Sequence, residues 1–154
     1  YNEAFIRNRL EEEIKRAIIY RRPCAFILLN IDNFQRFHEN FGLLQAEVTL
    51  KKVASSLLDS FTEVDRVARV SDNEFAVVLP ERNKRQAQKL AEEIRKKIEF
   101  TFSKERDVFK RLTVSGGVSE NPLDGVNAEE LITKAKKALN FAKTKRKNRI
   151  GILL

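Results

Sequence analysis

The chain has 154 residues, a formal net charge of +8 and an apolar share of 42%. This length suits one domain with a full-sized core, and no apolar run approaches the ~20 residues that cross a bilayer. The first residues carry acids and no small-residue cleavage site, so we do not expect them to form a secretory signal peptide. The charge favours an anionic partner, such as a nucleotide, a nucleic acid or an acidic protein surface, or it reflects a solvated basic surface.

The single cysteine, Cys24, lies in an apolar run and can form no disulfide within the chain. We therefore expect a buried thiol in a reducing cytoplasm.

The first part of the chain predicts a helix followed by a buried strand. Apolar residues at helical spacing, with Ile18 on the inner face, predict a helix that ends before Pro23. The continuous apolar run at 24–32 predicts a strand covered on both faces. Asp32 and Asn33 are then good N-caps for a short helix.

The remaining elements follow with few interruptions. Gly42 ends the short helix, and a long amphipathic helix with Leu58 on its inner face comes next. Two hairpin strands, a helix, a strand, a helix and a last strand are expected at 64–70, 74–80, 87–98, 109–120, 128–145 and 149–154. The order is helix, then β-α-α-β-β-α-β-α-β. It predicts an α/β sandwich of the ferredoxin-like or palm type, with a mostly antiparallel five-stranded sheet flanked by helices.

Several stretches resemble motifs of one family. RVSDNEFAVVLP resembles RxGGDEFxxxLP, FILLNIDNFQRFHENFG resembles DIDxFKxINDxxGH, LTVSGGVS resembles VTxSxGVA, and ELITKAKKALNFAKTKRKNRI resembles LLxxADxALYxAKxxGRNRV. These are motifs of the GGDEF family, the diguanylate cyclase domain, and they occur in the right order over essentially the whole chain. The resemblance implies a palm-like sheet on which two GTP molecules are joined into cyclic di-GMP with Mg²⁺. The family's DxLTGL turn is missing at the start, so we expect residues 1–154 to be a single GGDEF-like domain excised from a longer protein with an upstream domain.

The positions of the family's metal ligands carry amides here. The resemblance places one metal-binding acid at Asn30 and the other at Asn73, the third letter of the GGDEF turn. An amide oxygen can ligate a cation but supplies no charge, so metal binding should be much weaker. Asp32 points to the same strand face as Asn30 and is either a partial substitute or a helix cap, and we favour the cap. Glu74 matches the family's own Glu at the fourth letter.

The turn itself has also changed. Ser71 and Asp72 replace two glycines, which in the family bring the backbone close to the substrate phosphates. Asp72 adds negative charge where a triphosphate would lie. Ser71, Asp72, Asn73 and Glu74 still predict a tight hairpin turn, so we expect a vestigial site with no intact catalytic residue.

Four residues are candidates for nucleotide binding. His38 and Glu47 stand where the family has the Asn and Asp that contact guanine, and Glu47 can still accept hydrogen bonds from guanine. No partner for His38 is visible, so we expect a surface residue rather than a catalyst. Lys143 matches a Lys that holds the triphosphate, and Lys147 replaces an Arg, keeping the charge without the bidentate fork. A solvated basic helix end is an equally good interpretation of this run.

The family's feedback site, RxxD, is half present. Asp65 matches its Asp, but Thr62 replaces its Arg. Without that guanidinium we expect poor binding of cyclic di-GMP at this remnant.

We therefore expect a degenerate GGDEF domain without cyclase activity, acting as a regulatory or protein-interaction module in bacterial cyclic di-GMP signalling. Its partners would be the upstream domain and another protein or a second copy, with at most weak GTP or cyclic di-GMP binding, no cofactor and a cytoplasmic location. One alternative is a weak cyclase or another metal-dependent nucleotide-processing enzyme, which alone would need Mg²⁺. A second is a basic nucleic-acid-binding module, which the absence of an aromatic-rich strand motif disfavours.

Overall fold

The computed structural model describes residues 2–153. Its elements are α1 (Glu3–Tyr20), β1 (Cys24–Ile31), α2 (Phe34–Leu58), β2 (Arg66–Ser71), β3 (Glu74–Pro80), α3 (Lys84–Ser103), a short 3₁₀ helix (Val108–Lys110), β4 (Val114–Asn121), α4 (Ala128–Lys145) and β5 (Ile150–Ile152). The five predicted strands are all present. The strand expected at 109–120 begins only at Val114, because Val108–Lys110 form the 3₁₀ helix, and the ends of the others shift by three residues or fewer.

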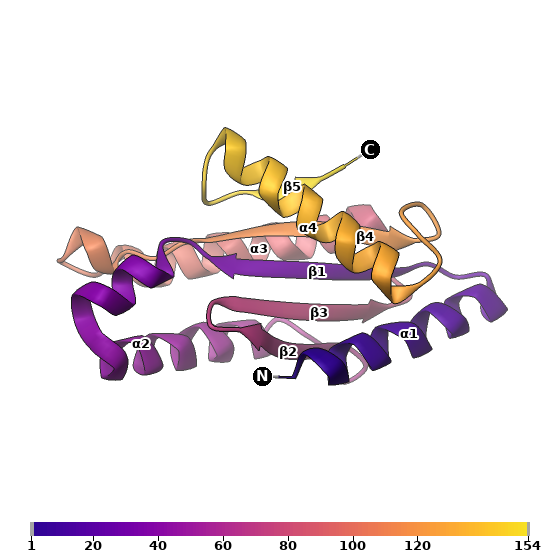
Figure 1. The fold of residues 1–154 in the computed structure, drawn as a ribbon, viewed down its shortest axis with the longest axis horizontal. Coiled ribbons are helices and arrows are strands. Elements are labelled where there is room, and N and C mark those ends of the chain that lie inside the picture. The colour runs from indigo at the N-terminus through magenta and orange to yellow at the C-terminus, as the bar shows by residue number, and fades with distance from the viewer. Residues whose placement is uncertain (1, 154) are drawn as a thin grey trace.

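The strands form one sheet in the order β2-β3-β1-β4-β5 (Figure 1). Every neighbouring pair is antiparallel except β4 and β5, which run parallel. The predicted palm-type sandwich with a mostly antiparallel five-stranded sheet is confirmed.

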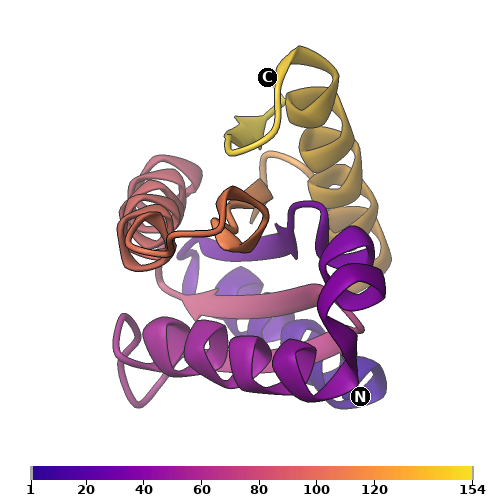
Figure 2. The same ribbon diagram turned by 90° about the vertical axis from the view of Figure 1, so that its left-hand side faces the viewer.

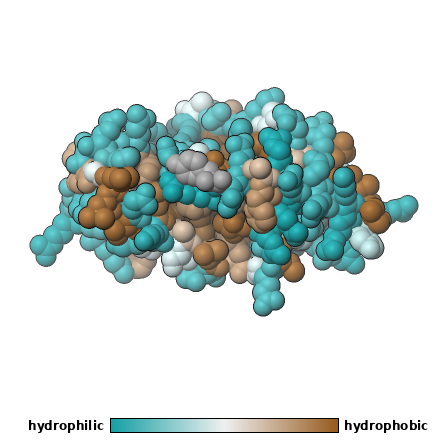
Figure 3. All heavy atoms as spheres, turned by 60° about the horizontal axis from the view of Figure 1, so that its bottom comes forward, coloured by the Kyte–Doolittle hydropathy of each residue, from teal (hydrophilic) through white to brown (hydrophobic). Residues whose placement is uncertain are grey.

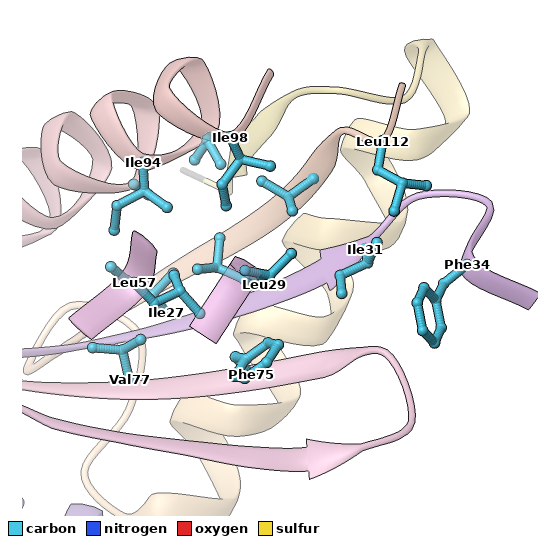
Figure 4. Packing of buried hydrophobic residues seen from close by; sticks show 14 of the residues in the cluster. Ile27, Leu29, Ile31, Phe34, Leu57, Phe75, Val77, Ile94, Ile98 and Leu112 are labelled. Atoms are coloured by element: carbon cyan, nitrogen blue, oxygen red, sulfur yellow. The ribbon is translucent and has the colours of Figure 1, made fainter. Parts of the chain in front are cut away.

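Helices cover both faces of this sheet. α1 and α4 pack on one face, and α2 and α3 on the other (Figure 2). Alternate residues of β1 serve the two layers: Phe26 and Leu28 face α1 and α4, whereas Ile27 and Leu29 face α2 and α3 (Figure 4). This is why β1 reads as an unbroken apolar run.

Two glycines let α4 lie directly on the sheet. A Cβ at Gly117 in β4 would stand 2.0 Å from the carbonyl oxygen of Ala135, and one at Gly151 in β5 would stand 2.3 Å from that of Ala138. No real side chain fits such a gap. The close contact fixes α4, and with it Lys143 near its end, over the edge where β1 terminates.

Gly42 separates two helical segments within α2, as expected, because its φ of 84° and ψ of 174° are not helical and the chain is kinked there. One expectation about helices needs correction. Ile18 and Leu58, expected on inner faces, are 53% and 63% exposed. Both belong to the last turn of a helix, and α1 extends past the end of the sheet there (Figure 1).

The predicted cap of α2 was also wrong in its chemistry. Asn33 does occupy the N-cap position, but its backbone is left-handed, with φ of 58°, and its side chain makes no capping hydrogen bond. Asp32 does not cap the helix either, because other groups use its carboxylate, as described below.

Among residues 2–153, no helix is both long enough and apolar enough to span a membrane.

Candidate functional site

The end of β1 and the β2–β3 hairpin meet at one edge of the sheet. Asn30 lies opposite Glu74 in the register of β1 with β3. The backbone N–H of Ile31 donates to the carbonyl of Asn73 across 2.8 Å, which ties the tip of the hairpin to β1. The structure therefore brings together the two segments that carry Asn30 and Asn73.

The Asn30 side chain bridges two opposite charges. Its Nδ2 donates to Glu74 Oε2 across 3.3 Å, and its Oδ1 accepts a hydrogen bond from Lys143 Nζ. A carboxylate at this position could accept from Lys143 but could not donate to Glu74. Asn30 is 8% exposed, so both contacts lie at the border of the core.

Asp32 is buried, with 1% of the residue exposed. Its carboxylate accepts hydrogen bonds from Thr113 Oγ1 at 2.8 Å, Ser115 Oγ at 2.9 Å and the backbone N–H of Asn148 at 2.9 Å. Lys143 Nζ stands 3.7 Å from Asp32 Oδ1. Donors from two segments, 113–115 and the loop at Asn148, thus use both oxygens of Asp32, which explains why it does not cap α2.

The loop after α4 is fixed over the same edge. Asn148 has a left-handed backbone, with φ of 61°. Its Oδ1 accepts from Arg95 across 2.8 Å, and its Nδ2 donates to Glu99. Lys147 Nζ donates to Asn33 Oδ1 across 2.6 Å, which directs this ammonium toward the turn between β1 and α2. Arg95 could not be predicted from sequence, because nothing in the sequence of α3 distinguishes it from the other cations of that helix.

A pocket of about 580 Å³ opens between α2 and the hairpin. Its walls are Phe34, Gln35, His38, Leu43, Ala46, Glu47, Leu50, Arg69, Asp72 and Asn73. Four of the residues singled out from sequence, His38, Glu47, Asp72 and Asn73, therefore share one cavity. Lys143 and Lys147 do not line it; they lie on the adjoining edge, with Asn30 and Asn33.

Arg69 is a wall of this pocket that the sequence analysis did not single out. Its Nε donates to the carbonyl of Ser71 at 3.1 Å, and its Nη2 donates to that of Asp72 at 3.0 Å. The guanidinium thus holds the hairpin from within the pocket. Sequence could have pointed to Arg69, because it matches the Arg at the start of the motif RxGGDEF.

The hairpin is a well-formed turn. Ser71 Oγ lies 3.3 Å from Asn73 Oδ1 and 3.4 Å from Glu74 Oε1. Neither Asp72 nor Asn73 is among the described residues with positive φ, so this backbone does not require glycine. The prediction of a tight turn between two strands is confirmed.

Asp65, the remnant of the feedback motif, closes a local turn. Its Oδ2 accepts from the backbone N–H of Thr62 at 2.9 Å and from its hydroxyl at 3.1 Å. Arg82 Nη2 stands 3.8 Å from the same oxygen. Thr62, which stands where the family has Arg, therefore donates hydrogen bonds to Asp65.

With this fold and site in view, the comparisons with known proteins identify the family. The sequence profile described as "Diguanylate cyclase, GGDEF domain" matches residues 1–149. The chain belongs to the GGDEF family. It is 27% identical over 153 residues to the response regulator PleD of Caulobacter vibrioides, covering 97% of this chain and 34% of that protein. It is 28% identical over 147 residues to the bifunctional diguanylate cyclase/cyclic di-GMP phosphodiesterase MucR of Pseudomonas aeruginosa, covering 96% and 21%. The chain thus spans about a third or less of the length of these relatives.

Solved GGDEF structures share the fold. The active GGEEF domain of a diguanylate cyclase from Vibrio cholerae superposes with a TM-score of 0.87 at 24% identity, covering 98% of this chain and 96% of that one. The GGDEF domain of DgcB from Caulobacter crescentus, in complex with c-di-GMP, gives 0.86 at 23% identity, covering 94% and 86%. At these identities the likeness supports the palm-like architecture alone.

The residues present do not fit the Mg²⁺ of this family. Within residues 2–153, no three His, Cys, Asp or Glu side chains are grouped so that they could hold a metal ion. Asn30 and Asn73 bring no charge, and protein donors already surround the carboxylate of Asp32. Mg²⁺ in proteins is usually bound through one or two carboxylates. Besides Asp32, the carboxylate at this edge is that of Glu74, and it already accepts hydrogen bonds from Asn30 and Ser71.

Proposed function

We propose that this chain is a degenerate GGDEF domain that makes no cyclic di-GMP and acts as a regulatory or protein-interaction module in bacterial cyclic di-GMP signalling. The observation that carries the proposal is the Asn30 amide held between Glu74 and Lys143. Joining two GTP molecules requires neutralisation of phosphate charge, for which the family uses a metal on acidic ligands. A site with amides at both ligand positions lacks the charge for that task.

The pocket between α2 and the hairpin supports weak nucleotide binding rather than turnover. Glu47 offers a carboxylate to the ring N–H groups of guanine, and His38 lines the same wall. Asp72, exposed on the opposite wall, places negative charge beside any phosphate that enters. We therefore propose at most weak binding of GTP or cyclic di-GMP, with Lys143 and Lys147 as the nearest cations.

The surface leaves room for a protein partner. α2 exposes Leu43 and Leu44, at 63% and 77%, and Leu43 also lines that pocket. One face of the molecule shows apolar side chains among hydrophilic ones (Figure 3). A GGDEF enzyme from Pseudomonas aeruginosa, SiaD, is known in complex with its activator SiaC. We propose by analogy that this domain works through protein contacts, within a longer cytoplasmic protein whose remaining part supplies the input.

The test is a search for product. The protein is incubated with GTP and Mg²⁺ or Mn²⁺, and cyclic di-GMP is quantified by mass spectrometry, with an active GGDEF enzyme as positive control. We expect no product above background. Product that forms with the wild-type protein and is lost in Glu74→Gln would establish the alternative, a weak cyclase, and overturn the proposal.

A further inference from the structure

The charged side chains that contact Asn30, Asp32 and Asn33, counted together with Asp32 itself, are balanced in charge. Asp32 and Glu74 supply two carboxylates, and Lys143 and Lys147 supply two ammonium groups at the same edge. Acids at positions 30 and 73, as in the family, would raise the number of carboxylates to four. The excess of two negative charges would then equal the charge of one divalent cation, and the two amides remove that excess.

The ammonium group of Lys143 contacts both Asn30 and Asp32. Lys143 Nζ donates to Asn30 Oδ1 and lies 3.7 Å from Asp32 Oδ1, and its side chain is 27% exposed. The Asn30 amide has a fixed orientation, since its Nδ2 donates to Glu74 across 3.3 Å. Asn30 therefore presents its oxygen to a cation that belongs to the protein.

We propose that the Lys143 ammonium is the built-in cation of this site and takes the electrostatic place of the divalent metal. The site is then balanced in charge without a bound ion. A divalent ion that approaches it is repelled by the Lys143 ammonium and finds oxygens that already accept hydrogen bonds from the protein. Any anion that enters this edge of the domain meets a fixed cation and has no need of a metal. This inference rests on the proposed function, because it describes a site that is not built for metal-assisted chemistry.

Direct titration with Mn²⁺ alone tests it, with electron paramagnetic resonance reporting the free ion. We expect weak binding by the wild-type protein. The double variant Asn30→Asp/Asn73→Asp restores the excess negative charge and should bind Mn²⁺ at least about tenfold more tightly. Lys143→Gln removes the built-in cation and should also raise the affinity.

The matched control is Lys145→Gln. Lys145 is an exposed residue two positions further along the chain, and its ammonium lies 5.2 Å from the ring centre of Phe141. This control loses the same charge from the same helix and should bind Mn²⁺ as the wild-type protein does. Circular dichroism checks that each variant is folded. If the double variant does not fold, Asn30→Asp alone carries the test, with a smaller gain expected.

Two results would overturn the inference: wild-type protein that binds Mn²⁺ as tightly as the double variant, or equal affinities for Lys143→Gln and Lys145→Gln. Neither depends on activity. Cyclic di-GMP made by the wild-type protein would instead refute the proposed function, so the two failures are distinguishable.

Discussion

At the residue scale, the site differs from an acidic metal site by changes that keep shape and remove charge. Asn30 has nearly the size of Asp, yet its amide donates to Glu74 as well as accepting from Lys143. Asp32, the acid that sequence alone offered as a substitute or a cap, is instead the centre of a buried hydrogen-bond network. Sequence identified these positions, but the hydrogen-bond partners of Asp32 come from two distant segments and could not be read from local spacing.

Asp32→Asn should lower the free energy of unfolding by about 2–4 kcal/mol. The amide leaves Thr113, Ser115 and the N–H of Asn148 with a poorer acceptor in a buried position, and Lys143 loses its charge partner. Urea unfolding measures the change. Asp59→Asn, at an exposed position at the end of α2, is the control and should shift stability by less than about 0.5 kcal/mol. Equal stability of the two variants would show that the hydrogen bonds to Asp32 do not stabilise the fold.

Cys24 should make stability fall at alkaline pH. Burial, and then the nearby charges of Glu13 and Glu120, raise the pKa of its thiol from 9.0 to about 12. Between these values the unfolded chain loses the thiol proton while the folded protein keeps it, so unfolding becomes more favourable as pH rises. The contribution is at most about 1.4 kcal/mol per pH unit and is absent below pH 9.

The measurement is the slope of unfolding free energy against pH above 9, compared between wild type and Cys24→Ala. The variant leaves a small cavity, which lowers its stability about equally at every pH, so the slope isolates the thiol. A slope unchanged by the substitution would contradict the assignment.

At the scale of elements, local sequence determined most of the fold. Apolar periodicity and turn residues predicted every strand and the order of the helices, because each element buries a regular stripe. The errors lie at the ends of elements. Ile18 and Leu58 follow the helical period beyond the part of the helix that other elements cover.

Gly117→Ala tests whether the contact of α4 with β4 positions the site. The new methyl group would stand 2.0 Å from the carbonyl oxygen of Ala135, so α4 must move or the protein must lose about 3 kcal/mol or more. Ser119→Ala, which removes a hydrogen bond of 2.7 Å to the carbonyl of Leu131 at the same interface, should cost only about 1 kcal/mol. Thermal unfolding ranks the two. A Gly117→Ala variant as stable as Ser119→Ala would mean that the helix is free to shift.

At the scale of the whole molecule, the net charge of +8 was only a weak guide to the partner. Composition does not distinguish a lysine at the site from a lysine elsewhere on the surface. The structure separates them: Lys143 and Lys147 are held at the end of β1, whereas Lys145 points to Phe141. Arg69 lines the pocket between α2 and the hairpin together with the residues that the motifs marked. Motif matching therefore predicted the segments that meet at the candidate site, and the structure adds the contacts of their side chains.

The most direct measurement is calorimetric titration of the wild-type protein with a non-hydrolysable GTP analogue, once with Mg²⁺ and once with a chelator. An amide-lined site with its own cation predicts weak or undetectable binding that is the same in both conditions. Micromolar binding that requires Mg²⁺ would contradict this account and would mean that Asp32 and Glu74 can still assemble a metal site.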